Sequence, residues 1–203
     1  MILHSDDDCK HSTSHSSSHE GCDVQLNKSI WTAALENDLS IIKKYFHKGK
    51  NLSVEDSCGY TALHHACRLN YFDIVEYLIL KKADVNAKGC GATPLQRAAY
   101  AGHVKVCLYL LENGADIDLQ DLSFCDQKTA LHKALYQHHY KLSSFLLKYG
   151  AAIDIPDCNS VTANDLIASL PSPLPPILEI HKEKEMFDLN FNLTFKVMIT
   201  GIL

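Results

Sequence analysis

The chain has 203 residues, of which 46% are hydrophobic, and this is enough for one domain with a buried core. The formal net charge is -5, and residues 1–26 hold five acidic residues against one lysine, so the remainder is close to neutral. This distribution argues against nucleic-acid binding, which needs a basic surface, and the absence of an apolar run of about 18 residues argues against a membrane span.

Residues 1–26 are rich in Ser, His and Asp and hold almost no apolar side chains. Such a segment cannot offset the entropy of ordering by burying apolar surface, so we expect it to be disordered. Its start has neither the basic region nor the apolar region of a secretory signal. We therefore expect a cytoplasmic or nuclear protein whose eight cysteines are reduced thiols.

The same N-terminal segment carries residue types that bind metals. They are His4, Cys9, His11, His15, His19 and Cys22. A tract rich in His and Cys can bind metal, but a defined zinc site has closer pairs, such as two cysteines two residues apart. We expect no defined metal site, and metal handling by this tract stays an alternative function.

One short pattern recurs in the middle of the chain. Residues 59–66 read Gly-Tyr-Thr-Ala-Leu-His-His-Ala, residues 91–98 read Gly-Ala-Thr-Pro-Leu-Gln-Arg-Ala, and residues 128–134 read Lys-Thr-Ala-Leu-His-Lys-Ala. The threonines of successive copies are 32 and 36 residues apart. A fixed period of this length indicates stacked units that bury their apolar faces against each other and leave one concave face exposed.

Within each period the apolar residues recur at helical spacing and predict two helices per unit. These residues are Leu63, Ala66 and Cys67, then Ile74, Val75, Leu78 and Ile79 in the second unit; Val104, Cys107, Leu108 and Leu111 in the third; and Leu142, Phe145, Leu146 and Leu147 in the fourth. Gly114 and Gly150 follow the second helices, where a left-handed residue closes the last turn. Lys82 takes that place in the second unit.

The repeats predict a domain at residues 27–170. Its units are expected at about 27–55, 56–87, 88–119 and 120–155, with a short C-terminal cap at 156–170. The first unit is degenerate, since Ile30-Trp31-Thr32 stands where the pattern belongs, and this is typical of a terminal unit. Residues 171–203 are expected to form a proline-rich linker and a tail.

The tail contains a second kind of pattern. Apolar and polar residues alternate over residues 187–200, which is the period of a strand. A lone strand beside helical units has no sheet to join. It can pair with a partner, associate with itself or stay disordered, and we favour disorder or loose packing.

The motifs Thr61-Ala62-Leu63-His64, Thr93-Pro94-Leu95 and Thr129-Ala130-Leu131-His132 resemble the ankyrin-repeat family. The resemblance implies an all-α ankyrin-repeat solenoid of helix-turn-helix units with projecting finger loops, about four units and a short C-terminal cap. It also implies a protein without enzyme activity or cofactor that recognises another protein.

The resemblance assigns structural roles to the motif residues. His64 and His132 are expected to bond the backbone of adjacent turns, and Gln96 can replace them in the third unit. Thr61, Thr93 and Thr129 are expected to cap helices, because a hydroxyl satisfies an unpaired N–H of the first turn. We find no catalytic triad, phosphate-binding glycine loop or metalloprotease helix in the sequence, so we predict no catalytic residue.

The partner site is expected at helix positions that the motif leaves free. His65, Arg97 and Lys133 share one register, Arg68, Tyr100 and Tyr136 share a second, Leu69 and Gln137 lie beside them, and Tyr60 and Phe124 extend the surface from the fingers. Tyr and Arg are common in interface hot spots. The cations favour an acidic or extended polar segment of a partner protein, bound by a monomer.

Three further hypotheses concern the fingers and the biological role. Cys58, Cys90, Cys125 and Cys158 recur near the finger turns, but units about 8–10 Å apart favour separate thiols over one metal or redox site. Asn86 resembles ankyrin asparagines that are hydroxylated, although a plain turn asparagine is the favoured interpretation. A substrate-selecting subunit of a ubiquitin-ligase-type or other enzyme complex is an alternative function.

Overall fold

The computed structural model describes residues 29–89, 91–122, 126–171, 176 and 178. In these residues the helices are α1 (Ile30–Leu35), α2 (Leu39–His47), α3 (Ala62–Arg68), α4 (Phe72–Leu80), α5 (Pro94–Ala101), α6 (Val104–Glu112), α7 (Ala130–Tyr136), α8 (Tyr140–Lys148) and α9 (Ala163–Ser169). The disordered N-terminal segment, the metal-binding tract and the alternating segment 187–200 proposed above lie outside the described residues.

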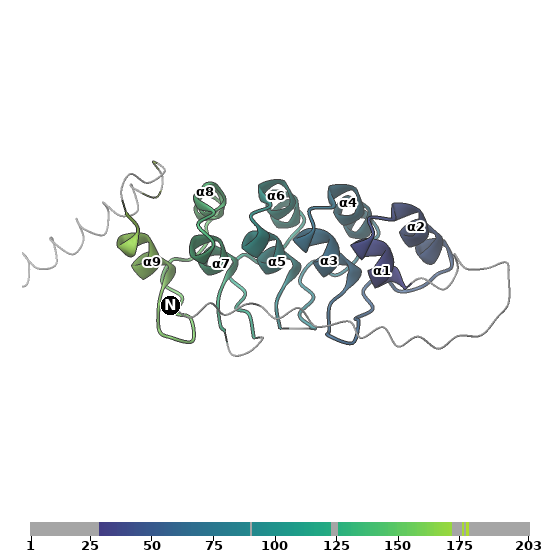
Figure 1. Cartoon of the computed structure of the whole chain (residues 1–203), viewed down its shortest axis with the longest axis horizontal. Helices are drawn as coiled ribbons and strands as arrows, with labels where there is room; N and C mark the ends of the chain where they lie inside the picture. The colour runs from purple at the N-terminus through teal and green to yellow at the C-terminus, as the bar shows by residue number, and fades with distance from the viewer. Residues whose placement is uncertain (1–28, 90, 123–125, 172–175, 177, 179–203) are drawn as a thin grey trace, which may run out of the picture.

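The helices form two rows (Figure 1). The odd-numbered helices α1 to α9 lie side by side and make up the inner row, while α2, α4, α6 and α8 make up the outer row. Finger loops extend from the inner row on the side away from the outer row. Neighbouring inner helices contact each other, and in α1 to α8 each helix contacts the other helix of its own pair, so the described residues form an all-α repeat solenoid.

Small residues let the inner helices pack closely. Ala66, Ala98 and Ala134 occupy equivalent positions in α3, α5 and α7, and none of them is accessible to solvent. The inner helices have six to eight residues, and isolated helices of that length are not stable in water. Packing between neighbouring units therefore stabilises these helices.

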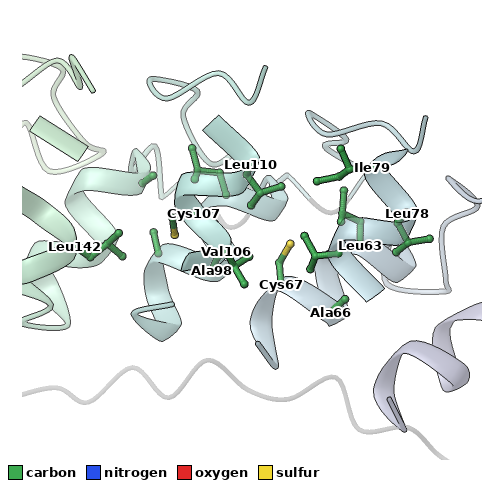
Figure 2. Packing of buried hydrophobic residues seen from close by; sticks show 14 of the residues in the cluster. Leu63, Ala66, Cys67, Leu78, Ile79, Ala98, Val106, Cys107, Leu110 and Leu142 are labelled. Carbon is green, nitrogen blue, oxygen red and sulfur yellow. The ribbon is translucent and has the colours of Figure 1, made fainter. Parts of the chain in front are cut away.

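The core runs between the two rows along the stack. Leu78, Leu110 and Leu142 of the outer row are buried, and Figure 2 shows them beside Leu63 and Ala98 of the inner row. Because the core is continuous across α3 to α8, no unit has a separate core of its own.

In α6 the rotation of the helix differs from the expected one. Val106, Cys107 and Leu110 are buried, whereas Leu108 and Leu111 are only partly buried. Apolar residues surround most of this helix, so periodicity leaves its rotation open. Contact with α5 and with the neighbouring outer helices decides it.

The turns after the outer helices have the expected left-handed geometry. The backbone angle φ is +64° at Lys82 and +88° at Gly114 and Gly150. A residue with a Cβ pays about 1 kcal/mol for this conformation, which glycine does not. The second unit thus keeps the common turn despite an unfavourable residue.

The two ends of the stack differ. At the start, α1 and α2 form a full helix pair, and the indole Nε1 of Trp31 donates to the Val54 carbonyl at 2.8 Å. At the other end, α9 follows Thr162 and packs against α7, and beyond it the described residues Pro176 and Leu178 are helical, with Leu178 buried in the core. Residues 163–169 thus provide the short terminal helix that covers the last inner helix.

We predict that Leu78→Ala lowers the free energy of unfolding by about 2–5 kcal/mol, because it leaves a cavity where the side chain is fully buried. Leu80→Ala is the matched control in the same helix, where the side chain is 64% exposed, and its effect should stay within about 0.5 kcal/mol. Urea denaturation followed by circular dichroism measures both. Equal losses for the two variants would contradict the described packing.

Candidate functional site

Each inner helix from α3 onward begins with a reciprocal hydrogen-bonded box. The backbone N–H of the capping threonine donates to the side chain three residues later: Thr61 to His64 Nδ1 at 3.1 Å, Thr93 to Gln96 Oε1 at 2.7 Å, Thr129 to His132 Nδ1 at 3.3 Å and Thr162 to Asp165 Oδ2 at 2.9 Å. The threonine hydroxyls face the same side chains or the backbone N–H groups of those residues. This arrangement satisfies donors that a helix start otherwise leaves unpaired.

The same side chains also reach the following finger. His64 Nε2 donates to the Ala92 carbonyl at 3.0 Å, Gln96 Nε2 to Leu119 at 2.6 Å, and His132 Nε2 to Val161 at 3.3 Å. Since Nδ1 of each histidine accepts from the threonine N–H, the proton of the neutral ring lies on Nε2. One residue thus caps its own helix and binds the following finger.

Burial keeps both histidines neutral. It lowers the pKa of His64 to about 4, and it also lowers the pKa of His132. Both side chains are at most 1% exposed, and both ring nitrogens are used in hydrogen bonds. Neither ring has a free nitrogen for acid–base chemistry on a bound substrate.

His65, Arg97 and Lys133 share one helix register, and finger aspartates hold two of them. His65 Nε2 lies 2.8 Å from Asp56 Oδ2, and Lys133 Nζ lies 2.7 Å from Asp121 Oδ2. His65 is only 7% exposed, so the expectation that it lies open on the concave face is wrong. The side chain of Lys133 is 12% exposed, and its charge is balanced inside the protein. The fingers fold back over the inner helices, and helix periodicity does not reveal this contact.

The Asp56 carboxylate also closes its own finger. Its Oδ1 accepts from the backbone N–H groups of Cys58 and Tyr60 at 2.9 Å each. Burial alone would raise the pKa of Asp56, but the hydrogen bonds from His65, Tyr60 and Cys58 outweigh it and hold this pKa below its ordinary value. Asp157 accepts from Asn159 and Val161 in the same way, so finger aspartates are repeated structural groups.

Arg97 differs from His65 and Lys133, which occupy the same helix position in the neighbouring units. Its unit has Lys88 at the position five residues before the capping threonine, where the second unit has Asp56. Arg97 is half-buried and forms no ion pair with any residue that the structure describes. Its guanidinium lies over the Tyr60 ring, 4.9 Å from the centroid. Arg97 is thus a positioned cation without a carboxylate.

The second register stays at the surface. Tyr100 is 36% exposed and Tyr136 39%, and Arg68 is also exposed. The Tyr136 hydroxyl donates to Asp157 Oδ2 at 3.2 Å, and burial together with this carboxylate raises the pKa of Tyr136 to about 12. Beside these residues Leu69 is half-buried and Gln137 is exposed, whereas Phe124 lies outside the described residues.

We call Tyr60, Arg68, Arg97, Tyr100 and Tyr136 the inner surface, because they come from the inner helices and the fingers at their base. Aromatic rings and one uncompensated guanidinium suit a carboxylate flanked by extended chain. Sequence reasoning missed the finger aspartates that bind His65 and Lys133. The recurrence of Asp five residues before a capping threonine, at Asp56 and Asp157, was the available signal.

Asn86 links neighbouring fingers. Its Oδ1 accepts from the Asp116 N–H at 2.9 Å, and its Nδ2 donates to the Gly114 carbonyl at 3.0 Å. Asp118 makes a similar contact one unit later, where its Oδ1 accepts from the Ala152 N–H at 2.9 Å. The Asn86 carboxamide therefore has a structural role, and its hydroxylation stays a prediction.

The cysteines fall into different classes. Cys58 is disulfide-bonded, so the expectation that every cysteine is a reduced thiol is wrong for this residue. Cys67 and Cys107 are buried in the core, and Figure 2 shows them between the rows. Burial raises the pKa of the Cys107 thiol to about 12 and that of Cys67 well above its ordinary value, so these two are protonated and unreactive.

Within the residues that the structure describes, no group of three or more His, Cys, Asp or Glu side chains is placed to hold a metal ion. No helix there has both the length and the apolar character needed to cross a membrane.

Comparison with known proteins agrees with this architecture. The model of the family "Ankyrin repeats (3 copies)" matches residues 30–121, and the model of the family "Ankyrin repeat" matches residues 126–158. Together these matches cover more than half of the chain.

Three curated relatives illustrate the range of proteins with similar segments. A probable E3 ubiquitin-protein ligase XBOS33 of Oryza sativa subsp. japonica is 36% identical over 88 residues, which is 42% of this chain and 17% of that protein. Human ankyrin repeat domain-containing protein 39 is 35% identical over 66 residues, 32% of this chain and 36% of that protein. The ankyrin repeat and KH domain-containing protein mask of Drosophila melanogaster is 36% identical over 100 residues, 46% of this chain and 2% of that protein. The chain thus spans a minor part of each relative.

We predict that His64 makes the protein less stable in mild acid. Its folded pKa of about 4 lies below the unfolded value of 6.5, so the unfolded state binds the proton first as the pH falls. This contribution to stability is complete above pH 6.5 and is lost between pH 6.5 and about 4, with a loss of about 2 kcal/mol between pH 7 and pH 5.

The variant His64→Gln should remove that part of the pH dependence and keep most of the stability at pH 7, because Gln96 makes equivalent contacts in the next unit. Urea denaturation at several pH values measures both effects. His47→Gln, at an exposed position of α2, is the control and should leave the pH profile as it is. A His64→Gln profile identical to that of the unaltered protein would refute the assignment.

Hydroxylation of Asn86 is the alternative to a plain turn asparagine, and it predicts an oxidised side chain. Peptide mass spectrometry of protein from cells with active hydroxylase should then find a gain of one oxygen on the peptide that contains Asn86. Asn113, exposed at the end of α6, provides a comparison in the same unit and should stay unmodified. An unmodified Asn86 peptide would rule the modification out.

Proposed function

Because the chain belongs to the ankyrin-repeat family, we propose that it is a non-enzymatic adaptor whose inner surface binds an acidic segment of another protein. Ankyrin repeats bind other proteins and are in general non-catalytic modules. Their presence over residues 30–121 and 126–158 supports the general role. The choice of surface and partner rests on the contacts described above.

The uncompensated charge of Arg97 carries this proposal. In the adjacent units a finger carboxylate holds the residue at the same register, as Asp56 holds His65 and Asp121 holds Lys133. In the third unit Lys88 replaces that aspartate. A glutamate or aspartate of the partner can therefore supply the missing carboxylate and bind the guanidinium through two parallel hydrogen bonds.

The surroundings of Arg97 favour binding at low entropic cost. The Tyr60 ring lies against the guanidinium and limits its rotation before any partner arrives. Tyr100, one helical turn further along α5, offers an exposed ring for side chains next to the bound carboxylate. Tyrosine and arginine provide large contact areas and are typical of binding hot spots.

The internal ion pairs restrict which kinds of acidic segment fit the inner surface. Since finger aspartates already bind His65 and Lys133, the inner surface has fewer available polar groups than its sequence indicates. One well-placed acidic residue within an extended segment fits it better than a long run of acidic residues.

A second candidate is a substrate-selecting subunit of an enzyme complex. The similarity to a probable E3 ubiquitin-protein ligase of rice favours this version, although it covers only 17% of that protein. The binding event would be the same, and the catalytic chain would be a separate protein. Co-purification of a ligase with the tagged chain supports this candidate, and its absence from a saturating purification counts against it.

We predict that Arg97→Glu and Lys88→Asp each weaken partner capture about tenfold or more. The first variant repels the partner carboxylate, and the second supplies an internal carboxylate that competes for Arg97. Lys141→Glu, with the same charge change at an exposed position of α8, is the control and should retain full capture.

Quantitative mass spectrometry of proteins captured from a cell lysate measures these effects, and peptides from the captured proteins then give dissociation constants. Melting temperatures should stay close to that of the unaltered protein, since Arg97 is in no internal ion pair among the described residues. Undiminished binding of the same proteins by Arg97→Glu would remove the inner surface as the site.

A further inference from the structure

A group of lysines and aromatic rings lies on the outer row at the start of the stack, far from the inner surface. No acidic residue occurs between Asp38 and Glu55, whereas Lys43, Lys44, Lys48 and Lys50 all fall in this stretch. The stretch contains α2, which is the neighbour of α4 in the outer row (Figure 1). Lys81 and Lys82 follow α4 directly.

The two helices meet through aromatic side chains. The rings of Phe46 and Tyr77 pack edge to face, with centroids 6.3 Å apart. Lys43 Nζ lies 5.7 Å from the Tyr77 centroid, and Lys81 Nζ lies 5.1 Å from Phe46 and 5.7 Å from Tyr77. One aromatic pair thus gathers ammonium groups from both helices.

A third lysine extends the group through the same type of contact. Lys50 Nζ lies 4.8 Å from the centroid of the Tyr45 ring. We call Lys43, Tyr45, Phe46, Lys50, Tyr77 and Lys81 the outer basic patch.

The lysines of this patch carry charge that the described protein does not balance. All three are exposed, and none forms an ion pair with a described residue. The acidic residues nearest to Lys81 in sequence, Glu76 and Asp84, are exposed and likewise form no ion pair with a described residue. Contact with the rings restricts the lysine side chains, so less entropy is lost when an anion binds them.

We propose that the outer basic patch docks a second acidic peptide segment of a partner protein. Carboxylates of that segment would lie between Lys43, Lys50 and Lys81, which attract them from two helices at once. Leu80, 64% exposed at the end of α4, offers an apolar contact next to Lys81. This surface belongs to the outer row and does not depend on binding at Arg97.

Other anionic partners fit the patch less well. A membrane-binding surface projects apolar rings into the lipid, but Tyr45, Phe46 and Tyr77 are partly buried against the core and have lysines over their faces. Nucleic-acid binding uses a longer basic stripe, whereas this patch is limited to the first two outer helices. A short acidic peptide matches its size.

Fluorescence anisotropy of a labelled peptide with alternating Glu and Ser tests the proposal. The full chain carries Arg97→Glu in every sample, so the inner surface does not contribute to the signal. Adding Lys43→Glu and Lys81→Glu should weaken binding about tenfold or more. Adding Lys105→Glu and Lys141→Glu instead should leave it unchanged, and this is a close control because Lys105 also lies over a ring of the outer row, 3.5 Å from the Phe72 centroid.

Three outcomes would overturn the proposal. The first is no binding of the acidic peptide, or equal binding of the peptide with Gln in place of Glu. The second is an equal loss of affinity in both double variants, which indicates unspecific charge attraction. The third is tighter binding to phosphatidylserine vesicles or to a single-stranded oligonucleotide than to the peptide. Circular dichroism of each variant confirms that the helices are intact.

Discussion

The side chain three residues after each capping threonine is the interaction on which the stack depends. At His64, Gln96 and His132 it accepts from the start of its own inner helix and donates to a carbonyl of the next finger. Helices of six to eight residues have little stability alone, so local capping and contact between units must occur together. Histidine and glutamine serve equally because the position requires one acceptor and one donor.

This double role distinguishes the residues that hold the stack together from the residues that a partner can reach. The box residues of α3, α5 and α7 are buried and have their polar atoms satisfied, and they leave no group for chemistry. The finger aspartates also occupy polar groups of the inner helices, since Asp56 binds His65 and Asp121 binds Lys133. Arg97 and the exposed tyrosines remain as the residues that a partner can bind. Under the proposed function, binding energy therefore comes from the few positions where the repeat departs from its own pattern.

The lysines of the outer row are held differently from those of the inner row. Its helices bury leucines toward the inner row, and its lysines lie over aromatic rings, away from carboxylates, as Lys81 does over Phe46 and Lys105 over Phe72. A lysine held by a ring keeps its charge available, whereas a lysine held by aspartate does not. The two faces of one solenoid thus differ in available charge although both contain many cations.

The sequence by itself determined the repeat period, the two helices per unit, the capping threonines and the left-handed residue at Lys82, because each depends on contacts within a few residues. It did not determine which polar residues are free. His65 and Asp56 are nine residues apart, and Arg97 meets Tyr60 across a unit boundary, so only the folded fingers bring these groups together. The rotation of α6 was also decided by its neighbours, since apolar residues surround most of that helix. Local patterns set the architecture, and contacts between units decided which charges remain for a partner.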